Sequence, residues 1–373
     1  MIVNSIESVP LPAGESDARP RCAVATLSGV EPLEALERVA YLQDRGLLPT
    51  QKTAAFLKAA DVVRNLPEGE LETRVMAGTL TDLPGIGAST GEVIVQAMQG
   101  RVPDRIARLE DETRIPLGHG AGLRAAIKGD CHTHSTWSDG GASIATMARA
   151  ASALGHQYLV VTDHSPRLTV AHGLNRDRLL AQLDEIAALN EELAPFRILT
   201  GIEVDILVDG QLDQDEDLLE QLDVVVASVH SKLGMDAPHM TERIVKAVAS
   251  PHVDILGHCT GRKVKGSGAG LREIRARSDY DTQLVFDACF AYGTAVEINC
   301  RPERQDPPPE LLDQALDAGC LISIDTDAHS PGHLEFLSYG CDKAVAHGIS
   351  ADRIVNTWSA DDLLAWTSAR RAA

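Results

Sequence analysis

Two histidines separated by one residue mark the first candidate chemistry of this chain, in the stretch CHTHSTWSDG at 131–140. Residues i and i+2 of a β-strand point to the same face, so His132 and His134 would aim two imidazoles at one point, as a metal ion requires. Asp139 follows five residues after His134 and adds a carboxylate. Because an isolated H-x-H also occurs in ordinary surface loops, the rest of the chain has to decide between the two interpretations.

Ligand-type residues recur at the ends of later apolar, β-branched runs. They are His164, Glu203, His230, His258, Glu297, Asn299, Asp327 and His329. A hydrogen-bonding cap at the end of a strand would explain any one of them, but it does not explain the repetition. Their number exceeds the four to six ligands of a single ion, which predicts two or three divalent ions that share a bridging carboxylate. Mixed nitrogen and oxygen ligands suit zinc, manganese or iron, whereas calcium prefers oxygen alone.

The apolar runs alternate with stretches of helical periodicity, which predicts an α/β protein with a parallel sheet. With the strand before His132, the expected strands are 157–164, 197–203, 223–230, 253–258, 294–299 and 321–329. Seven strand–helix units favour a closed or nearly closed barrel. Parallel barrels build their active sites at the carboxyl ends of their strands, where these ligand-type residues stand.

The chain before the barrel has a different character. Residues 1–30 show no clear period and are expected to form a loosely ordered arm. Residues 31–115 carry apolar positions at helical spacing, with Pro or Gly between the segments, and predict a small all-helical domain. The barrel domain is expected over residues 128–373.

The bulk composition narrows the classes of protein that fit. The chain has 44% hydrophobic residues and a formal net charge of −20, so nucleic acid would have to bind through a local basic patch. Its seven cysteines form no C-x-x-C pair, which favours reduced thiols and a cytoplasmic protein. No signal peptide or membrane-spanning run is visible, and no P-loop, G-x-S-x-G or dinucleotide motif follows a strand.

At the ligand-type residues the chain resembles the PHP (polymerase and histidinol phosphatase) superfamily, and above all the PHP domain of bacterial family X DNA polymerases. The motifs that carry the resemblance are DCHTHSTWSDG, VTDHS, GIEVDI, VDILGHCTGR, EINCRPERQDPP and ISIDTDAHS. The resemblance implies a distorted (β/α)7 barrel with a trinuclear metal centre. It assigns one ion to His132, His134, Glu203 and Asp327, a second to Glu203, His230 and His258, and a third to Asp139, His164 and His329.

The helical part resembles the small helix-hairpin-helix domain of the same polymerases. LPGIG at 83–87 would be the hairpin, whose backbone N–H groups at Gly85, Ile86 and Gly87 would bind a DNA phosphate. The polymerase palm and fingers are missing between the two parts, which excludes polymerisation on this chain. Residues 31–114 hold 10 Lys and Arg against 14 Asp and Glu, so DNA binding here should be weak, and a purely structural helical domain is the alternative.

These features predict a metal-dependent hydrolase of phosphate esters, in which a metal-bridged hydroxide attacks phosphorus and Glu203 and Asp327 are catalytic. Arg262 is the candidate phosphate clamp, with Arg301 and Arg304 as the alternative. The expected substrate is DNA, cut by a 3′–5′ exonuclease or a repair-type nuclease. A phosphomonoesterase of a small metabolite such as histidinol phosphate is the alternative, and a non-catalytic DNA-binding protein is a third. Expected partners are DNA or another phosphate ester, DNA repair or replication proteins, and no membrane.

Overall fold

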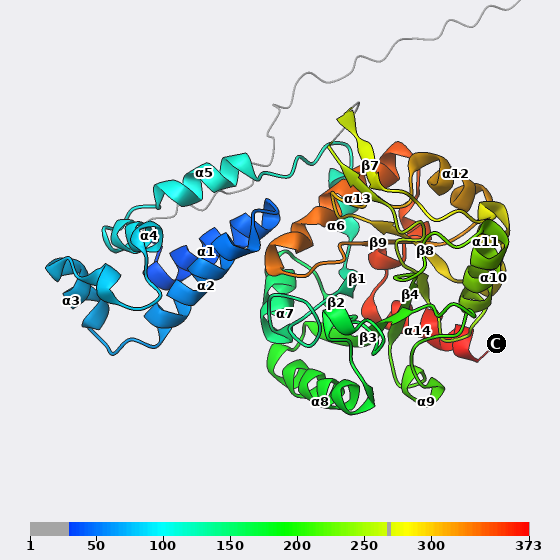
Figure 1. Cartoon of the computed structure of the whole chain (residues 1–373), viewed down its shortest axis with the longest axis horizontal. Coiled ribbons are helices and arrows are strands. Elements are labelled where there is room, and N and C mark those ends of the chain that lie inside the picture. The colour runs from blue at the N-terminus through cyan, green and yellow to red at the C-terminus, as the bar shows by residue number, and fades with distance from the viewer. Residues whose placement is uncertain (1–29, 267–269, 373) are drawn as a thin grey trace, which may run out of the picture.

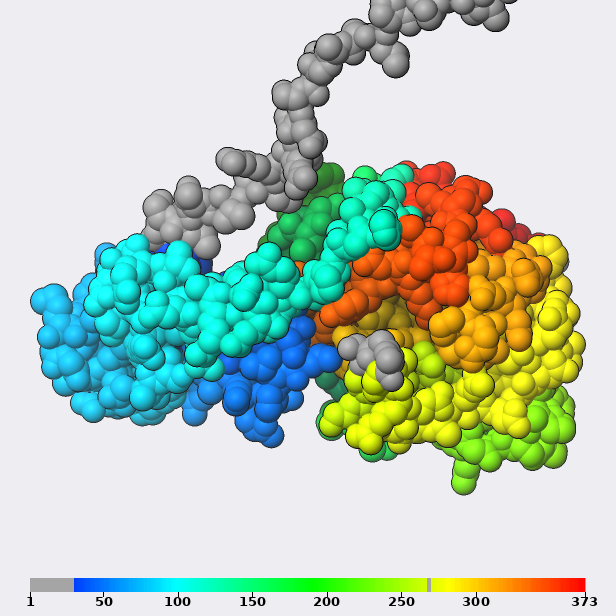
Figure 2. All heavy atoms as spheres, turned by 90° about the horizontal axis from the view of Figure 1, so that it is seen from above, coloured from blue at the N-terminus to red at the C-terminus, as the bar shows by residue number. Residues whose placement is uncertain are grey.

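The computed structural model describes residues 30–266 and 270–372. A helical region lies beside a barrel of alternating strands and helices (Figure 1). Figure 2 shows the same two parts from above, with the helical region in blue and cyan and the barrel in green to red. The loosely ordered arm predicted over residues 1–30 lies outside the described residues, apart from Val30.

The helical region consists of five α-helices and a short 3₁₀ turn. They are α1 (Pro32–Arg45), α2 (Thr50–Arg64), α3 (Glu70–Ala77), η1 (Leu80–Asp82), α4 (Ala88–Met98) and α5 (Asp104–Glu112). Proline at the first position of α1 suits a helix start, and Gly78 ends α3 in the left-handed conformation that glycine adopts without strain. Leu36, Phe56 and Ile94 are buried in one apolar cluster, so the region has a core of its own.

Seven parallel strands form the barrel sheet, in the order β1-β2-β3-β4-β5-β8-β9. They are β1 (Gly129–Thr133), β2 (Tyr158–Val161), β3 (Arg197–Asp205), β4 (Val224–Ser228), β5 (Ile255–Leu256), β8 (Ala295–Asn299) and β9 (Ile322–Asp325). Most strand positions are buried on both faces, as expected for a parallel sheet covered by helices. Several strands are shorter than the apolar runs that predict them, because those runs continue into the loops that carry the ligand-type residues.

Helices surround the sheet, and the start of each helix ends the loop that follows the preceding strand. They are α6 (Ala121–Ala126), α7 (Ile144–Ala153), α8 (Arg176–Leu193), α9 (Glu216–Leu219), α10 (Ala237–Val248), α11 (Thr282–Tyr292), α12 (Pro309–Asp317), η4 (Pro331–Phe336), α13 (Leu337–Ala346) and α14 (Ala360–Arg371). The side chains of Ser143 and Asp281 accept backbone N–H groups at the starts of α7 and α11. Such caps stabilise a helix start and thereby limit the length of the preceding loop.

The first and last strands approach each other without a continuous ladder. A single bridge joins Thr133 to Ala328, and the Asp325 side chain accepts the Cys131 N–H at 2.8 Å. On the other side of this seam, the Asp130 side chain accepts the Thr326 N–H at 3.3 Å. The predicted α/β fold class is therefore confirmed as a nearly closed barrel of seven parallel strands, preceded by an all-helical region.

Two elements of the barrel were not predicted. An antiparallel ribbon of β6 (Lys263–Lys265) and β7 (Arg272–Arg275) follows β5, and α14 ends the described chain. The described cysteines (131, 259, 289, 300, 320 and 341) are buried and free, in agreement with the predicted thiols. Among the described residues, no helix is long and apolar enough to cross a membrane.

Candidate metal centre

The centre of the candidate site is the carboxylate of Glu203, near the end of β3. One of its oxygens lies 3.1 Å from His230 Nε2 and 2.8 Å from His258 Nε2. The other oxygen lies 2.9 Å from His164 Nδ1 and 3.4 Å from His132 Nε2. His134 Nε2 lies 3.6 Å from the same oxygen, so strands β1 to β5 bring five imidazoles to one carboxylate that is 1% exposed.

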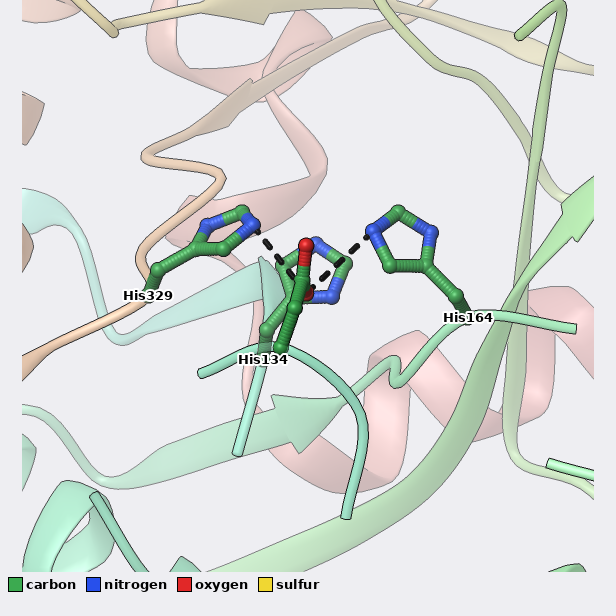
Figure 3. Close-up of side chains that lie close together, drawn as sticks. His134, His164 and His329 are labelled. Atoms are coloured by element: carbon green, nitrogen blue, oxygen red, sulfur yellow. Dashed lines mark ion pairs between the residues drawn. The ribbon is translucent and has the colours of Figure 1, made fainter. Parts of the chain in front are cut away.

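A second group lies next to Glu203 at the more open edge of the site (Figure 3). His134, His164 and His329 face Asp139, whose Oδ1 lies 3.5 Å from His164 Nε2 and 3.4 Å from His329 Nε2. The side chains of Asp139 and His329 are 36% and 23% exposed, whereas those of His132 and Glu203 are 0% and 1% exposed. A substrate would therefore reach the cluster past Asp139 and His329.

Buried carboxylates behind these residues orient the ring nitrogens. Glu297 lies 2.6 Å from His132 Nδ1, so the Nε2 atom of that ring is left to face Glu203. Asp205 accepts the backbone N–H of His230 at 3.1 Å, and the same oxygen lies 3.6 Å from Nδ1 of the His230 ring. Such carboxylate–histidine pairs fix the tautomer of a metal-binding imidazole and raise its basicity.

Asp163 organises the loop that carries Asp139. Its carboxylate accepts the Ser135 N–H at 2.8 Å, the Ser138 N–H at 3.1 Å and the Gln182 amide at 2.6 Å. Asp163 is 1% exposed, and these bonds fold residues 135–138 around it. The loop thereby turns back toward the cluster, which places Asp139 opposite His164.

The pKa values of the cluster reflect competition between burial and charge. Burial alone would raise the pKa of Glu203, but the charges of His230, His132 and His164 hold it well below its usual range. Burial lowers the pKa of His134, and His329 and His164 lower it further, so this ring is neutral. Burial opposes protonation of His132 and His230, but Glu297 and Glu203 raise the pKa of His132 well above its usual range, and Glu203 and Asp205 raise that of His230 to about 9. A divalent ion requires neutral imidazoles, so its binding here would release protons from these two rings.

The buried polar atoms test whether the cluster fits a metal. His132, His134, His164, His230 and His258 each leave at least one buried ring nitrogen without a hydrogen-bond partner among the described residues, as does one oxygen of Glu203. Unpaired buried polar atoms are costly, so a set that converges on shared points needs a ligand. Three groups have ligand atoms within 4.8 Å of one another: His134–Asp139–His164–His329, His132–His134–Glu203 and His164–Glu203–His230. The residues therefore fit divalent cations.

Sequence comparison connects this geometry to known proteins. The PHP domain family matches residues 130–279. A probable phosphatase of Thermoanaerobacter sp. (strain X514) is 30% identical over 241 residues, which cover 61% of this chain and 89% of the phosphatase. The chain belongs to the PHP family. It is therefore a hydrolase of phosphoester bonds, as predicted.

Two further proteins are similar to part of this chain. The DNA polymerase/3′-5′ exonuclease PolX of Bacillus subtilis (strain 168) is 40% identical over 240 residues, and the match spans 64% of this chain and 41% of PolX. The crystal structure of a histidinol phosphate phosphatase from Lactococcus lactis, complexed with zinc, L-histidinol and phosphate, superposes with a TM-score of 0.42. It is 15% identical and covers 60% of this chain and 95% of that protein.

The PHP barrel brings all nine predicted metal ligands to the same end, although their grouping differs from the predicted sets. His134 belongs both to the group around Glu203 and to the group around Asp139. His164 likewise contributes one ring nitrogen to each of two groups. Asp327 lies 3.4 Å from His134 Nε2, beside the ion site that the resemblance assigns to it.

Arg262, the first candidate for a phosphate clamp, points away from this cluster. Its Nε donates to the carbonyl of Arg304 at 3.1 Å, and its Nη2 donates to the carbonyl of Gln305. Arg304 instead contacts the cluster, with Nε 3.0 Å from Asp327 Oδ2. Arg301 donates to the carbonyl of Asp327 at 2.9 Å, and its Nη1 lies 2.9 Å from His329 Nδ1. The alternative pair of arginines is thus the pair that faces the PHP site, because the carbonyls of the following loop occupy Arg262.

The predicted DNA-binding hairpin lies in the helical region, between η1 and α4. Ile86 is 4% exposed, and its N–H donates to Leu83, while the Gly87 N–H donates to the side chain of Thr90. Gly85 has φ of +105°, which suits glycine at this turn. The sequence missed Arg105, which donates to Ser89 at the start of α4 with a distance of 2.8 Å. Arg105 comes 16 residues after Ser89, so no local sequence pattern indicates that it lies beside the hairpin.

Proposed function

We propose that this chain hydrolyses phosphodiester bonds at the end of a DNA strand, as a 3′–5′ exonuclease or a repair-type nuclease. The observation that carries the proposal is the convergence of five histidines on the Glu203 carboxylate. PolX, which is named for a DNA polymerase and a 3′-5′ exonuclease activity, supports DNA as the substrate. The match covers 41% of PolX, so we propose only the exonuclease activity, and we assign it to the PHP barrel.

Two to three divalent ions of zinc, manganese or iron would be held by the nine residues. They are His132, His134, Asp139, His164, Glu203, His230, His258, Asp327 and His329. Bound ions would act as Lewis acids, lower the pKa of a coordinated water and neutralise charge on the phosphoryl group. Glu203 would serve more than one ion, since its two oxygens face different histidines.

The protein groups around this set orient the substrate. Arg304 keeps its guanidinium beside the cluster through Asp327, where it can donate to a phosphate oxygen and neutralise its charge. Nδ1 of His329 lies 2.9 Å from the carbonyl oxygen of Asp327, and donation to this oxygen leaves Nε2 of the ring free to face Asp139. Arg301 donates to the same carbonyl at 2.9 Å. Arg262 supports the same loop from behind through the carbonyls of Arg304 and Gln305, and we assign it a positioning role.

The helical region is proposed to add affinity for DNA. Gly85, Ile86 and Gly87 form a turn before α4 in which Ile86 is buried and Gly87 is exposed, and Arg105 supplies a positive charge at the start of that helix. A helix N-terminus with a neighbouring cation favours a phosphate. The N–H groups of Ile86 and Gly87 already donate to Leu83 and Thr90. The contact with a DNA phosphate would therefore be weaker than one made by three unpaired N–H groups.

A phosphomonoesterase is the second candidate, and the probable phosphatase that matches over 89% of its length favours it. The deciding experiment compares purified, Mn²⁺-loaded protein on a 3′-labelled single-stranded oligonucleotide, on bis-p-nitrophenyl phosphate and on p-nitrophenyl phosphate. The proposal expects nucleotide release from the oligonucleotide and faster hydrolysis of the diester. A protein that hydrolyses only the monoester is a phosphomonoesterase, and this result would contradict the proposal.

A further inference from the structure

The β6–β7 ribbon places like charges directly opposite each other. Lys263 pairs with Arg275, and Lys265 pairs with Arg272. Val264, between the two lysines, is 2% exposed, whereas Lys263, Lys265 and Arg272 are exposed and Arg275 is half-buried. The apolar residue thus anchors the ribbon to the protein. Lys263, Lys265 and Arg272 leave their charges exposed, whereas the Nε of Arg275 donates to the carbonyl of Gly261 at 2.8 Å.

This arrangement is unfavourable in the protein alone. Like charges directly opposite each other in an antiparallel pair destabilise it, and this chain has 54 Asp and Glu against 34 Lys and Arg. Partial burial lowers the pKa of Lys263, and the neighbouring Arg304 and Arg275 lower it further. A face that concentrates positive charge in an acidic protein is the expected form of an anion-binding surface.

The ribbon is attached to the loop that contacts the candidate metal centre. Val264 donates its N–H to the carbonyl of Glu303 at 2.8 Å. The next residue, Arg304, lies 3.0 Å from Asp327. In Figure 1 the ribbon projects from the edge of the barrel. Arg304, paired with Asp327, and Arg301, paired with Glu303 at 2.7 Å, therefore lie on the loop that joins the cluster to the ribbon.

We infer that this face binds the phosphate backbone of a single-stranded nucleic acid whose end lies at the metal centre. The inference rests on the proposed function. Successive residues of a strand rise about 3.3 Å, so Lys263 and Lys265 are about 6.6 Å apart, and their partners lie about 5 Å across the ribbon. A polymer of phosphates can contact the three exposed cations, Lys263, Lys265 and Arg272, with successive phosphate groups. Contacts to backbone phosphates carry no base preference, so binding would be independent of sequence.

The test neutralises the two ribbon cations that are farthest from the cluster, in the double variant Lys265→Gln/Arg272→Gln. The matched control, Arg149→Gln/Arg197→Gln, removes the same charge from exposed arginines that pair with Glu192 and Asp361 elsewhere on the barrel. Binding of a fluorescent, phosphorothioate-linked oligothymidylate of 20 nucleotides to the Mn²⁺-loaded full chain is measured from 50 to 300 mM salt. Hydrolysis of an unmodified oligonucleotide and of bis-p-nitrophenyl phosphate is measured in parallel.

Loss of two phosphate contacts should raise Kd about tenfold at low salt and reduce the slope of log K against log salt by about 1.4, which is about 0.7 for each contact. The ratio of kcat/KM for the oligonucleotide to that for the small diester should fall about tenfold, and the control should match wild type. An unchanged salt slope, an equal effect in the control, or equal loss on both substrates would overturn the inference. If wild type hydrolyses neither substrate but the slope still falls, the proposed function fails while the binding surface stands.

Discussion

Arg45, the last residue of α1, lies 3.1 Å and 3.2 Å from the two carboxylate oxygens of Glu335, six residues after His329. Tyr41, one turn earlier in α1, donates its hydroxyl to the same carboxylate at 2.7 Å. A Cβ atom added to Gly332 would lie 2.3 Å from the carbonyl oxygen of Tyr41, so only glycine allows this close approach. The helical region thus packs directly on the segment that follows a candidate metal ligand.

This contact predicts that the helical region supports the metal centre as well as binding substrate. Glu335→Ala should weaken metal binding at the Asp139–His164–His329 group about threefold to tenfold, because residues that orient ligands affect metal affinity. Metal titration followed by elemental analysis measures the change. Glu37→Ala, which removes the ion pair with Arg64 inside the helical region, is the control. Equal metal affinity in Glu335→Ala and wild type would contradict this support. The helical region would then contribute only affinity for DNA, as proposed above.

Replacing Glu203 should abolish hydrolysis and leave the chain folded. Glu203→Ala removes a carboxylate that faces five histidines, and even the loss of residues behind metal ligands costs about 10- to 100-fold in activity. We expect a loss of more than about 100-fold in kcat on the diester, together with fewer bound ions. Circular dichroism checks the fold, and Glu192→Ala on an exposed helix face is the control. Near-native turnover by the folded variant would exclude a central role for this carboxylate.

Glu297→Gln should lower metal affinity, although Glu297 is not one of the nine predicted metal ligands. Its carboxylate lies 2.6 Å from His132 Nδ1, where a charged acceptor favours the tautomer that leaves Nε2 available. The expected loss is about 10- to 100-fold in affinity at the ion bound by His132, seen by competition with a chelator. The amide of glutamine keeps the size of the side chain, so an unaltered affinity would show that charge at this position is unimportant.

Chelation should remove activity and lower thermal stability together. Metal that binds the folded chain stabilises it by mass action, and the unpaired ring nitrogens of His134 and His230 are left buried without it. Treatment with EDTA should abolish ester hydrolysis and lower Tm, and Mn²⁺ or Zn²⁺ should restore both, with two to three equivalents bound. Recovery of full activity with less than one equivalent would contradict a multinuclear site.

His156 predicts a pH dependence of stability away from the metal centre. Burial, helped by the charge of Arg124, lowers the pKa of His156 from 6.5 to about 3. The unfolded chain therefore binds a proton below pH 6.5 that the folded chain does not bind, so stability falls as pH drops from about 6.5 toward 3. From pH 7 to 5 this group should cost about 2 kcal/mol, which His156→Gln should remove while the exposed His119→Gln should not. Urea denaturation at both pH values measures the difference.

The sequence alone determined the barrel and the identity of the candidate ligands. Strands with a side-chain period of two, separated by helices, can only run parallel, so the carboxyl ends of all strands meet at one end of the barrel. Residues such as His132, Glu203 and Asp327 stand at those ends and had to approach one another. This prediction does not require the order of the strands in the sheet.

Only the tertiary structure decided how these residues are shared and what surrounds them. His134 serves two groups because the Asp139 loop folds around Asp163, a contact that depends on Gln182 from a distant helix. Arg304 replaces Arg262 beside the cluster because nearby carbonyls bind Arg262, and the sequence carries no signal for that competition.

The cationic ribbon and the contact between Arg45 and Glu335 also depend on the tertiary structure. The charges of Lys265 and Arg272 become neighbours only through the register of two short strands, and Arg45 meets Glu335 across 290 residues of chain. Local sequence patterns report backbone period and burial, which are properties of single elements. Side-chain pairs between elements depend on loop geometry and on competition among hydrogen-bond partners, and these are decided when the whole chain packs.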